Sequence, residues 1–368
     1  MKNLKIAIVH DDFIQNGGAE FFIFDIAKEL QKNQQFKITV VSSIVTSDWE
    51  NKFKELNIEV KESFLGKLPF VRYYSKILFL TPLFYISFES FDFSEYDFVI
   101  SSSTRYGHSV ITKPETIHIS YINSPGKMMW ETKKYFYGKK FLYHLVKNFL
   151  PLNRLYDYYS QHRSDYLIAN SKNISSKIRK NYKLESQVLY PFINFEKIKK
   201  SNLPKKDYFI LISRLIPWKR IDFVIEAFNE LKLPLVIVGS GDDSYIEKLK
   251  EKAKDNITFV GFVSDKRKYQ LLEEAKGLIF PQDEDFGLTM IESLYLNTPV
   301  IYFNNGGAKE ILKEIYGIPF KYQDKNSLIE ALNSYSEKDF GDLMGYALNF
   351  RKEVFIEAIS KFLNKQQV

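Results

Sequence analysis

Short apolar runs alternate with longer amphipathic stretches along most of the chain. Between the first two runs, residues 19–33 carry apolar side chains at three-and-four spacing, which predicts a helix. The alternation restarts after about residue 195, and a second amphipathic stretch follows its first run. The pattern predicts strands within 5–9, 37–43, 98–103, 118–122 and 165–170, and then within 208–215, 234–241, 257–263, 276–282 and 298–303.

This order of elements favours an α/β protein with two parallel sheets, each built from strand–helix–strand units. A chain of 368 residues is also long enough for two domains. We expect an N-terminal domain over 1–190 and a second domain over 191–345. The amphipathic stretch 346–368 predicts a final helix that packs back on the first domain.

The composition excludes several classes of functional site. The hydrophobic share is 45%, the charged share 26%, and cysteine is absent, which excludes disulfides, thiolate zinc sites and cysteine nucleophiles. The first residues form a short apolar run closed by two aspartates, which is typical of a buried strand and unlike a signal peptide. We therefore expect a cytoplasmic protein that is soluble or peripheral to a membrane.

The positive charge is concentrated in one band. Residues 101–185 hold 15 basic and 5 acidic side chains, a net charge of +10, although the whole chain has only +7. Within residues 127–150, six lysines alternate with aromatic residues, a composition that suits an anionic membrane surface. The alternative is a helix with an aromatic inner face and solvated lysines outside. No RNA-binding signature is present, so we expect no nucleic acid.

Three loops carry candidate chemistry. In the first, Gly17 and Gly18 stand between a strand and a helix, where backbone approaches a ligand closely and the helix dipole attracts an anion. In the second, Arg214 and Lys219 follow the run 208–212, and two cations at a sheet edge suit a diphosphate. The alternatives are a plain connecting loop and a solvated basic turn.

The third loop joins a strand to a helix around Gly287. Its carboxylate Glu284 can accept hydrogen bonds from sugar hydroxyls, and Glu292 in the early helix can turn toward a ribose. The N–H groups at the start of this helix are uncapped donors for phosphate. Two alternatives remain: an Asp283–Asp285 metal pair, and Glu292 as an ordinary exposed helical residue. Glycine loops at 239–241 and 306–307 are predicted at the same sheet edge.

Taken together, these motifs resemble the family 4 retaining glycosyltransferases of GT-B architecture, in which two Rossmann-like domains of doubly wound parallel sheet face each other across a cleft. The similarity is carried by residues 17–20, 213–228, 284–300 and 306–312, and by the middle segments 86–103, 118–131 and 165–182. The middle segments look most like polysaccharide and lipopolysaccharide sugar transferases, including O-antigen enzymes, several of which use GDP-mannose.

The resemblance implies a transfer of a sugar from a nucleotide-diphosphate donor, GDP-mannose or a UDP-sugar, to a glycan or lipid-diphosphate-linked acceptor. It implies no metal and no cofactor, because cations and helix dipoles stabilise the departing phosphate. The implied catalytic residues are Arg214, Lys219 and Glu284, and the implied acceptor or sugar contacts are Glu20 and Asn123. The implied donor-binding residues are Gly17, Gly18, Gly239, Gly241, Phe262, Phe286, Gly287, Leu288, Thr289 and Glu292.

One position departs from the family. Relatives usually carry histidine in a Y-x-H-T-P segment, whereas this chain has Asn123 in Tyr121-Ile122-Asn123-Ser124-Pro125. An amide cannot act as a general base, although it can hydrogen-bond a sugar. Two other functions therefore stay open: a nucleotide-sugar epimerase or phosphorylase-like enzyme of the same fold, and a weakened subunit that binds a nucleotide-sugar or glycan.

Overall fold

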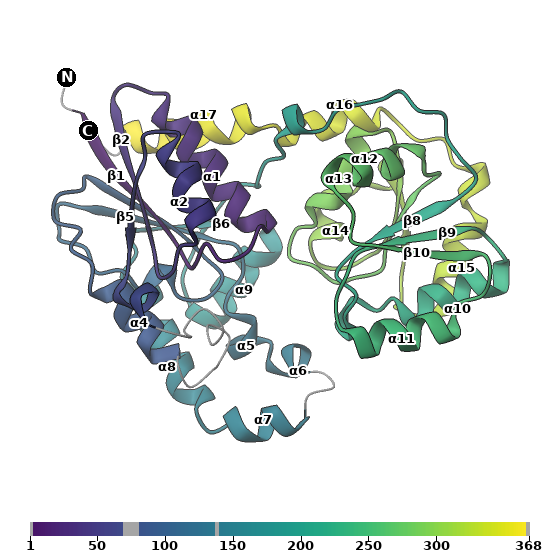
Figure 1. The fold of residues 1–368 in the computed structure, drawn as a ribbon, viewed down its shortest axis with the longest axis horizontal. Helices are drawn as coiled ribbons and strands as arrows, with labels where there is room; N and C mark the ends of the chain where they lie inside the picture. The colour runs from purple at the N-terminus through teal and green to yellow at the C-terminus, as the bar shows by residue number, and fades with distance from the viewer. Residues whose placement is uncertain (1–2, 69–80, 137–139, 366–368) are drawn as a thin grey trace. The chain divides into compact units, whose positions relative to one another are not determined.

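The computed structural model describes residues 3–68, 81–136 and 140–365. The chain divides into two compact units, residues 1–191 with 356–368, and residues 192–355. Each unit is built on a sheet in which every pair of neighbouring strands is parallel (Figure 1). The fold is therefore α/β with two doubly wound parallel sheets, as the alternation of runs predicts.

The N-terminal sheet has the order β3-β2-β1-β4-β5-β6-β7. Its strands are nearly continuous apolar runs because helices cover both faces of a parallel sheet. Ile6, Ala7, Ile8 and Val9 in the first strand are fully buried. The strands are β1 (Leu4–His10), β2 (Phe36–Ser42), β3 (Glu59–Glu62), β4 (Phe98–Ser103), β5 (Ile117–Ile122), β6 (Tyr166–Ala169) and β7 (Gln187–Val188).

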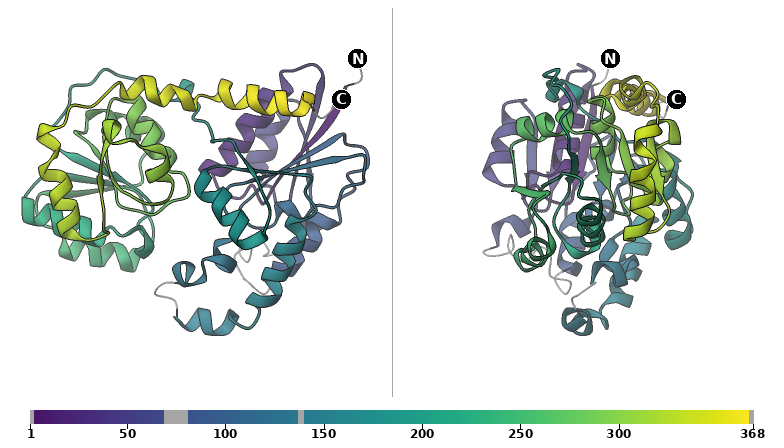
Figure 2. Two further views of the ribbon diagram at one scale, coloured as in Figure 1. Left: turned by 180° about the vertical axis from the view of Figure 1, so that it is seen from behind. Right: turned by 90° about the vertical axis from the view of Figure 1, so that its right-hand side faces the viewer.

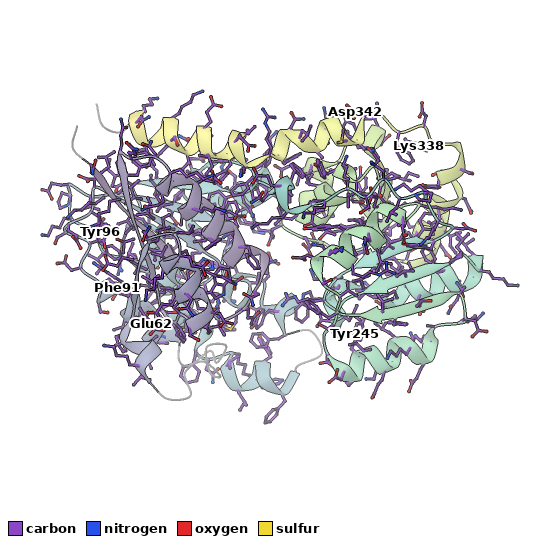
Figure 3. The ribbon with its side chains drawn as sticks, turned by 45° about the horizontal axis from the view of Figure 1, so that its top comes forward. Glu62, Phe91, Tyr96, Tyr245, Lys338 and Asp342 are labelled. Carbon is purple, nitrogen blue, oxygen red and sulfur yellow. The ribbon has the colours of Figure 1, made fainter. Side chains whose placement is uncertain are left out.

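Helices flank this sheet on both sides (Figures 1 and 2). The first two pack together through the rings of Phe24 and Trp49, 5.8 Å apart. Phe91 and Tyr96 border an aromatic core beneath β4 (Figure 3). The helices are α1 (Gly18–Gln31), α2 (Ser47–Lys54), α4 (Thr81–Glu89), α5 (Lys127–Trp130), α6 (Thr132–Tyr135), α7 (Lys140–Val146), α8 (Leu150–Gln161) and α9 (Lys172–Tyr182).

The C-terminal sheet has the order β10-β9-β8-β11-β12-β13. Its core includes buried apolar residues from all six strands and from the helices over 222–231, 243–252 and 325–333, and the side chain of Tyr245 packs against it (Figure 3). The strands are β8 (Phe209–Ile212), β9 (Leu235–Val238), β10 (Ile257–Gly261), β11 (Leu278–Phe280), β12 (Val300–Phe303) and β13 (Gly317–Phe320).

The helices of this unit again lie on both faces of their sheet (Figure 1). Side-chain caps begin several of them; Asp342 Oδ1, for example, accepts from Gly345 N at 2.8 Å (Figure 3). The helices are α10 (Asp222–Leu231), α11 (Asp243–Lys252), α12 (Asp265–Glu274), α13 (Leu288–Tyr295), α14 (Gly306–Ile311), α15 (Lys325–Asn333) and α16 (Leu343–Ala347).

The last helix, α17 (Lys352–Lys365), begins in the C-terminal unit and ends in the N-terminal unit. Its Phe362 ring meets Tyr166 of β6 edge-on, with ring centroids 5.0 Å apart. The return falls at Ile356, ten residues beyond the expected boundary at 346. The reason is that α16 packs on α13 and Phe350 accepts a backbone hydrogen bond from Ile193 at 2.8 Å, which keeps residues 343–355 in the C-terminal unit.

Candidate functional site

The predicted cationic and acidic loops of the C-terminal unit meet at one point of its sheet. Strands β8 and β11 are neighbours, and the strand order changes direction between them. Arg214 and Lys219 follow β8, and Glu284 follows β11. In open parallel sheets such a switch point leaves a crevice at the carboxyl ends of the strands, where ligands bind. The topology therefore gathers the three residues that the sequence singled out separately.

Lys219 and Glu284 are in direct contact. The Lys219 Nζ atom donates to Glu284 Oε1, and the Lys219 side chain is 12% exposed and that of Glu284 28%. Lys219 ends a short 3₁₀ turn, Pro217–Lys219, which brings its side chain back toward β11. The cation and the carboxylate neutralise each other at the switch point, and an ammonium with three N–H donors can contact a further anionic oxygen.

Unlike Lys219 of the same loop, Arg214 forms no ion pair with another described residue. Its side chain is exposed to solvent. The next arginine, Arg220, is instead held by the backbone carbonyl of Gln323 at 3.1 Å and by Asp222 at 3.2 Å. One arginine of the loop is thus structural, and the other presents its charge to solvent.

Gly239 and Gly241 have a packing role. A Cβ atom on Gly239 would lie 1.8 Å from the Ser213 carbonyl oxygen, and one on Gly241 would lie 2.1 Å from the Leu215 carbonyl oxygen. The Leu215 N–H also donates to the Ser240 carbonyl at 2.9 Å. These glycines let the loop after β9 lie directly against the loop that carries Arg214 and Lys219.

A second glycine pair supports Glu284 in the same way. The Gly307 N–H donates to the Glu284 carbonyl at 2.8 Å, and a Cβ on Gly307 would lie 2.6 Å from the Phe286 Cα atom. Gly306 adopts a φ of +56°, and a Cβ there would lie 2.5 Å from the Glu284 carbonyl oxygen. The loop after β12 therefore holds the backbone of the carboxylate loop in place.

The helix that follows Glu284 begins without a side-chain cap. Gly287 precedes α13 with φ of +94°, and the N–H groups of the first turn, at Leu288 and Thr289, are available as donors. The Phe286 side chain is buried and meets the ring of Phe350 at 5.9 Å. Any ligand contact of Phe286 would therefore involve its backbone.

Glu292 is held from the neighbouring helix α12. Its carboxylate accepts from Lys268 Nζ at 3.2 Å and from the Tyr269 hydroxyl at 3.1 Å. Burial and the nearby Glu292 charge raise the pKa of Tyr269, which keeps its hydroxyl protonated as a donor. The interpretation of Glu292 as an ordinary exposed residue is wrong, because this side chain is only 13% exposed and is bonded to Lys268 and Tyr269.

Phe262 lies just beyond β10, the edge strand of the same sheet. It is among the most exposed aromatic side chains of the described residues, with 83% of its surface accessible. An exposed ring needs a reason, and a planar ligand stacked on it would supply one.

In the N-terminal unit, the start of α1 already has a carboxylate. Gly17 precedes α1 with an extended backbone, and Gly18 is its first residue. The Glu20 Oε2 atom lies only 2.5 Å from the place that a Cβ on Gly17 would take. Burial raises the pKa of Glu20, while His10 and the N–H groups of Glu20 and Gly17 act against that rise. The predicted anion position therefore holds Glu20 in this structure.

Behind this loop, Asp11 is buried and saturated with donors. Its carboxylate accepts from the backbone N–H groups of Tyr106 and Gly107 at 2.7 Å each, and from the N–H and hydroxyl of Thr104 at 2.8 and 2.9 Å. Although burial opposes ionisation, Arg105, His10 and these N–H groups lower the pKa of Asp11 to about 2. Arg105 also forms an ion pair with Asp12.

Asn123 stands at the carboxyl end of β5. Its Nδ2 atom donates to Ser102 Oγ at 2.9 Å, and its carbonyl accepts from Asn170 Nδ2 at the same distance. Asn123 therefore joins β4, β5 and β6 at the edge of the sheet, with its side chain partly exposed.

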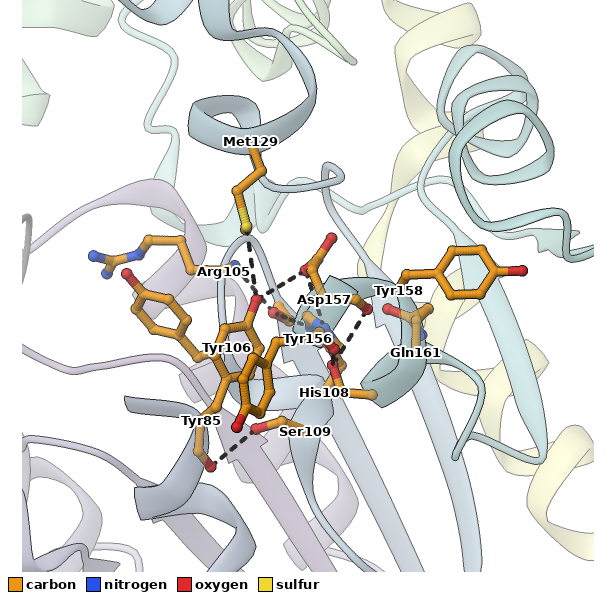
Figure 4. Close-up of polar contacts among 12 residues, drawn as sticks. Tyr85, Arg105, Tyr106, His108, Ser109, Met129, Tyr156, Asp157, Tyr158 and Gln161 are labelled. Atoms are coloured by element: carbon orange, nitrogen blue, oxygen red, sulfur yellow. Dashed lines mark hydrogen bonds and ion pairs between the residues drawn. The ribbon is translucent and has the colours of Figure 1, made fainter. Parts of the chain in front are cut away.

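A buried cluster around Asp157 lies beneath this edge (Figure 4). The carboxylate of Asp157, on α8, accepts from Tyr85, Trp130 and Tyr182 at 3.2, 2.5 and 2.7 Å. His108 Nε2 lies 3.2 Å from Asp157 Oδ1, and His108 Nδ1 lies 3.0 Å from the Ser103 hydroxyl. This chain of contacts connects α8 to the loop that surrounds Asp11.

Four residues of these clusters do not stand out in the sequence as candidate site residues: Asp11, Arg105, His108 and Asp157. The signal for Asp11 was present, because two aspartates close the first buried strand. The other three lie in segments whose polar residues look like surface residues until the fold buries them. No group of three or more potential metal ligands occurs among the residues that the structure describes.

The fold and these loops can now be set beside known proteins. Residues 194–354 match the family described as glycosyl transferases group 1. Over 370 residues the chain is 26% identical to the α-1,3/1,6-mannosyltransferase ALG2 of Dictyostelium discoideum, covering 84% of each protein. It is 25% identical to the O-antigen chain mannosyltransferase C of Escherichia coli over 134 residues, 34% of this chain and 36% of that protein. The crystal structure of Anabaena HepE with UDP superimposes with a TM-score of 0.72 at 17% identity, covering 98% of this chain and all of HepE.

Proposed function

We propose, from the premise that this chain is a mannosyltransferase-like glycosyltransferase of the GT-B fold, that it moves a sugar with retention from a nucleotide-diphosphate donor to a glycan or lipid-linked acceptor. The donor in this proposal is GDP-mannose or a UDP-sugar. The pathway is the biosynthesis of a cell-surface polysaccharide or lipopolysaccharide. The observation that carries the proposal is the Lys219–Glu284 pair at the switch point of the C-terminal sheet.

This pair suits the two ends of a sugar–diphosphate. Glu284 accepts hydrogen bonds from the donor-sugar hydroxyls, while Lys219 and the exposed Arg214 contact the diphosphate oxygens. The N–H groups of α13 from Gly287 to Thr289 add the positive end of a helix dipole. Because Lys219 touches Glu284, a donor bound here would place its sugar and its phosphates on adjacent groups.

The same residues support the chemical step. The acceptor hydroxyl attacks the anomeric carbon from the side on which the diphosphate leaves, and a phosphate oxygen of the donor takes the hydroxyl proton. The transition state resembles an oxocarbenium ion, and negative charge grows on the departing diphosphate. Lys219, Arg214 and the start of α13 are cationic or dipolar groups that stabilise that charge without moving. We propose no metal and no cofactor for this step.

The remaining donor contacts follow from the same arrangement. Glu292, positioned by Lys268 and Tyr269, accepts hydrogen bonds from the ribose. The exposed ring of Phe262 stacks on the base. Gly239 and Gly241 allow the close approach of the neighbouring loop. The resemblance also implies Gly17 and Gly18, at the start of α1, as donor contacts.

We propose that the N-terminal unit binds the acceptor. Glu20 and Asn123, at the carboxyl edge of its sheet, hydrogen-bond the acceptor sugar. A lipid-diphosphate-linked acceptor would bring the protein to an anionic membrane surface, as a peripheral protein on the cytoplasmic face. No helix among the described residues is long and apolar enough to span a bilayer.

A second function is favoured by one residue. Asn123 replaces the histidine usual in the resembling family, and an amide cannot accept the proton of a hydroxyl. A subunit that binds a nucleotide-sugar or glycan without turning it over would tolerate this change. Such a subunit would be stabilised by a nucleotide-sugar yet would release no nucleotide diphosphate.

The test begins with thermal shift assays against UDP, GDP, UDP-glucose and GDP-mannose, because a ligand that binds only the folded state raises the Tm. The stabilising donor is then supplied to the wild type and to Glu284→Ala, and release of the nucleotide diphosphate is followed. A matched control is Glu196→Ala, which removes another lysine-paired carboxylate of the same unit, bonded to Lys352 at 2.8 Å.

The proposal expects Glu284→Ala to lose turnover and Glu196→Ala to keep it. Equal turnover in the wild type and Glu284→Ala would overturn the assignment of the site. Donor binding without turnover in the wild type would favour the binding subunit.

A further inference from the structure

Helix α8 turns its apolar side to solvent. Leu152, Leu155, Tyr156 and Tyr159 are 51%, 51%, 38% and 61% exposed. Their spacing of three and four residues places them on a single stripe of the helix. The opposite stripe is polar and buried: Asn153, Asp157, Ser160 and Gln161 are each at most 2% exposed. This order is the reverse of an ordinary surface helix.

The polar inner stripe fixes the rotation of α8. Asp157 accepts a hydrogen bond from Tyr85 (Figure 4) and two more from Trp130 and Tyr182. Gln161 Nε2 donates to Ser120 Oγ at 3.1 Å. Turning the helix to bury its leucines would leave these buried polar groups without partners, at a large cost in free energy. The outward apolar stripe is therefore a stable feature of the fold.

Helix α7 and its connection to α8 extend the apolar surface. Phe141, Leu145 and Phe149 are each at least half exposed. A small core of Met128, Phe136, Val146 and Leu150 packs beneath them, so α7 is anchored to the rest of the unit. Both views of the unit show α7 and α8 adjoining one another away from the sheet (Figures 1 and 2). We call the exposed residues Phe141, Leu145, Phe149, Leu152, Leu155, Tyr156 and Tyr159 the α7–α8 surface.

The charge around this surface is positive. Residues 127–150 contain six lysines and one glutamate; residues 137–139 of this stretch lie outside the described residues, and Lys133 and Lys147 are exposed. The two carboxylates of residues 127–161 do not offset these charges, because Glu131 is paired with Lys177 at 2.5 Å and Asp157 is buried. Exposed leucines, phenylalanines and tyrosines next to lysines match the boundary between anionic headgroups and acyl chains.

We infer that the α7–α8 surface inserts into the headgroup region of an anionic lipid bilayer. A second copy of the chain is a poorer occupant, because two such surfaces would bring their lysines together. Large exposed apolar patches mark interaction sites in soluble proteins, and the surrounding charge selects the negatively charged partner. This inference deepens the proposed function. It rests on that function in one respect: membrane contact would give the enzyme access to a lipid-linked acceptor.

The test is sedimentation with phosphatidylcholine vesicles, with and without phosphatidylglycerol, in the absence of donor and acceptor. The wild type is expected to sediment with the mixed vesicles and much less with phosphatidylcholine alone, and added salt is expected to weaken binding. The double variant Leu152→Ser/Leu155→Ser should partition about tenfold less, or weaker still. Lys133→Glu/Lys147→Glu should lose the preference for phosphatidylglycerol.

The matched control is Ile315→Ser/Tyr322→Ser, which removes two exposed apolar side chains from the other unit, 52% and 57% accessible. Its binding should equal that of the wild type. The Tm of all three variants should stay near the wild-type value, because the replaced side chains are exposed. An unchanged Tm makes any loss of vesicle binding a property of the surface.

Three results would overturn the inference. The first is no binding of the wild type to mixed vesicles, and the second is equal binding by the leucine variant. The third is a wild-type dimer that the leucine variant does not form, with no vesicle binding by either protein. The donor reaction is measured separately. Vesicle binding without donor turnover would contradict the proposed function and support the inference on the α7–α8 surface. Donor turnover without vesicle binding would support the proposed function and contradict the inference on the surface.

Discussion

The carboxyl edges of the two sheets have the same topology but differ in where their charged side chains lie. At the first edge they are buried and hydrogen-bonded, and at the second they lie closer to solvent. In each unit the strand order changes direction at one point, beside β1 and β4 in the first and β8 and β11 in the second. At the first edge the buried Asp11 carboxylate accepts hydrogen bonds from five donors, and Arg105 forms an ion pair with Asp12. At the second, Arg214 is exposed, and Lys219 and Glu284 share one contact.

The means of holding the loops differ accordingly. At the N-terminal edge, hydrogen bonds to a buried carboxylate set the path of residues 103–109. At the C-terminal edge, glycines at 239, 241, 306 and 307 let backbone lie against backbone, so these contacts between loops need no charged side chain. Packing by glycine leaves cations and carboxylates near solvent, where a charged ligand can reach them.

Asp11→Asn is expected to destabilise the protein more than any other substitution considered at the N-terminal edge. The amide nitrogen of asparagine would face N–H donors that now bond a carboxylate, leaving buried groups unpaired. We expect the free energy of unfolding to fall by about 3–5 kcal/mol, measured by urea denaturation. The same substitution at the exposed helix cap Asp242→Asn should change it by less than about 0.5 kcal/mol, since asparagine also caps helices. Equal effects at the two positions would contradict the contrast.

Lys219→Met should show the opposite pattern at the C-terminal edge. Removing a cation that faces the departing diphosphate should lower kcat for donor turnover by about 100- to 1,000-fold. The free energy of unfolding should change little, because the remaining Glu284 is partly exposed and water can solvate it. Steady-state kinetics and urea denaturation on the same preparation separate the two effects. A large loss of stability with normal kcat would place Lys219 among the structural residues.

Acid should open the N-terminal unit first. Burial lowers the pKa of His118 to about 3, so the folded state holds it neutral while the unfolded chain binds a proton below about pH 6.5. Stability from this group is complete above that pH and falls by up to about 1.4 kcal/mol per pH unit down to about pH 3. Asp11 adds a loss of stability in the same direction from its ordinary pKa of 3.8 down to its folded-state pKa of about 2.

The C-terminal unit has no matching group among the shifted pKa values of its described residues, which belong to lysines and tyrosines. Hydrogen exchange followed by mass spectrometry at decreasing pH reports on the two units separately. The variant His118→Gln, which does not titrate, should shift acid opening to lower pH. Earlier opening of the C-terminal unit would count against this account.

The smallest expected effect concerns Glu292. Tyr269→Phe removes one hydrogen bond to its carboxylate while Lys268 keeps its own, so affinity for the nucleotide should fall about two- to fivefold. Tyr208→Phe is the matched control, since that hydroxyl donates to the Leu271 carbonyl at 2.8 Å instead. Titration calorimetry with the nucleotide identified by thermal shift measures both. Identical affinities would remove Glu292 from the predicted donor contacts.

Much of this fold could be predicted from the alternation of apolar runs. Each of the ten predicted runs overlaps a strand of the structure, and the helix predicted at 19–33 corresponds to α1. Three strands were not predicted: β3, β7 and β13 are short, and the first two present few buried apolar side chains. The mannosyltransferase-like resemblance and the GT-B fold are confirmed by the comparisons. The roles of individual site residues remain predictions.

For the candidate site, too, some residues could be predicted from the sequence and others only from the fold. Three charged residues stand out in the sequence because they lie in loops that follow buried strands: Arg214, Lys219 and Glu284. Glu292 stands out because it lies early in the helix after one of these loops. The partners of Glu292 could not be predicted, since Lys268 and Tyr269 lie on a different helix. The basic aromatic segment was predicted with two alternatives, and only the folded chain showed that α8 buries polar residues and exposes leucines.

The sequence by itself determined the two parallel sheets and the residues at the ends of their strands, because both depend on local periodicity and on residues adjacent in the chain. Only the tertiary structure decided that Lys219 meets Glu284, that glycines after β9 and β12 support those loops, and that Asp11 and Asp157 are buried. Burial and pairing depend on segments distant in sequence, and the free energy of a charged group is set by what surrounds it after folding.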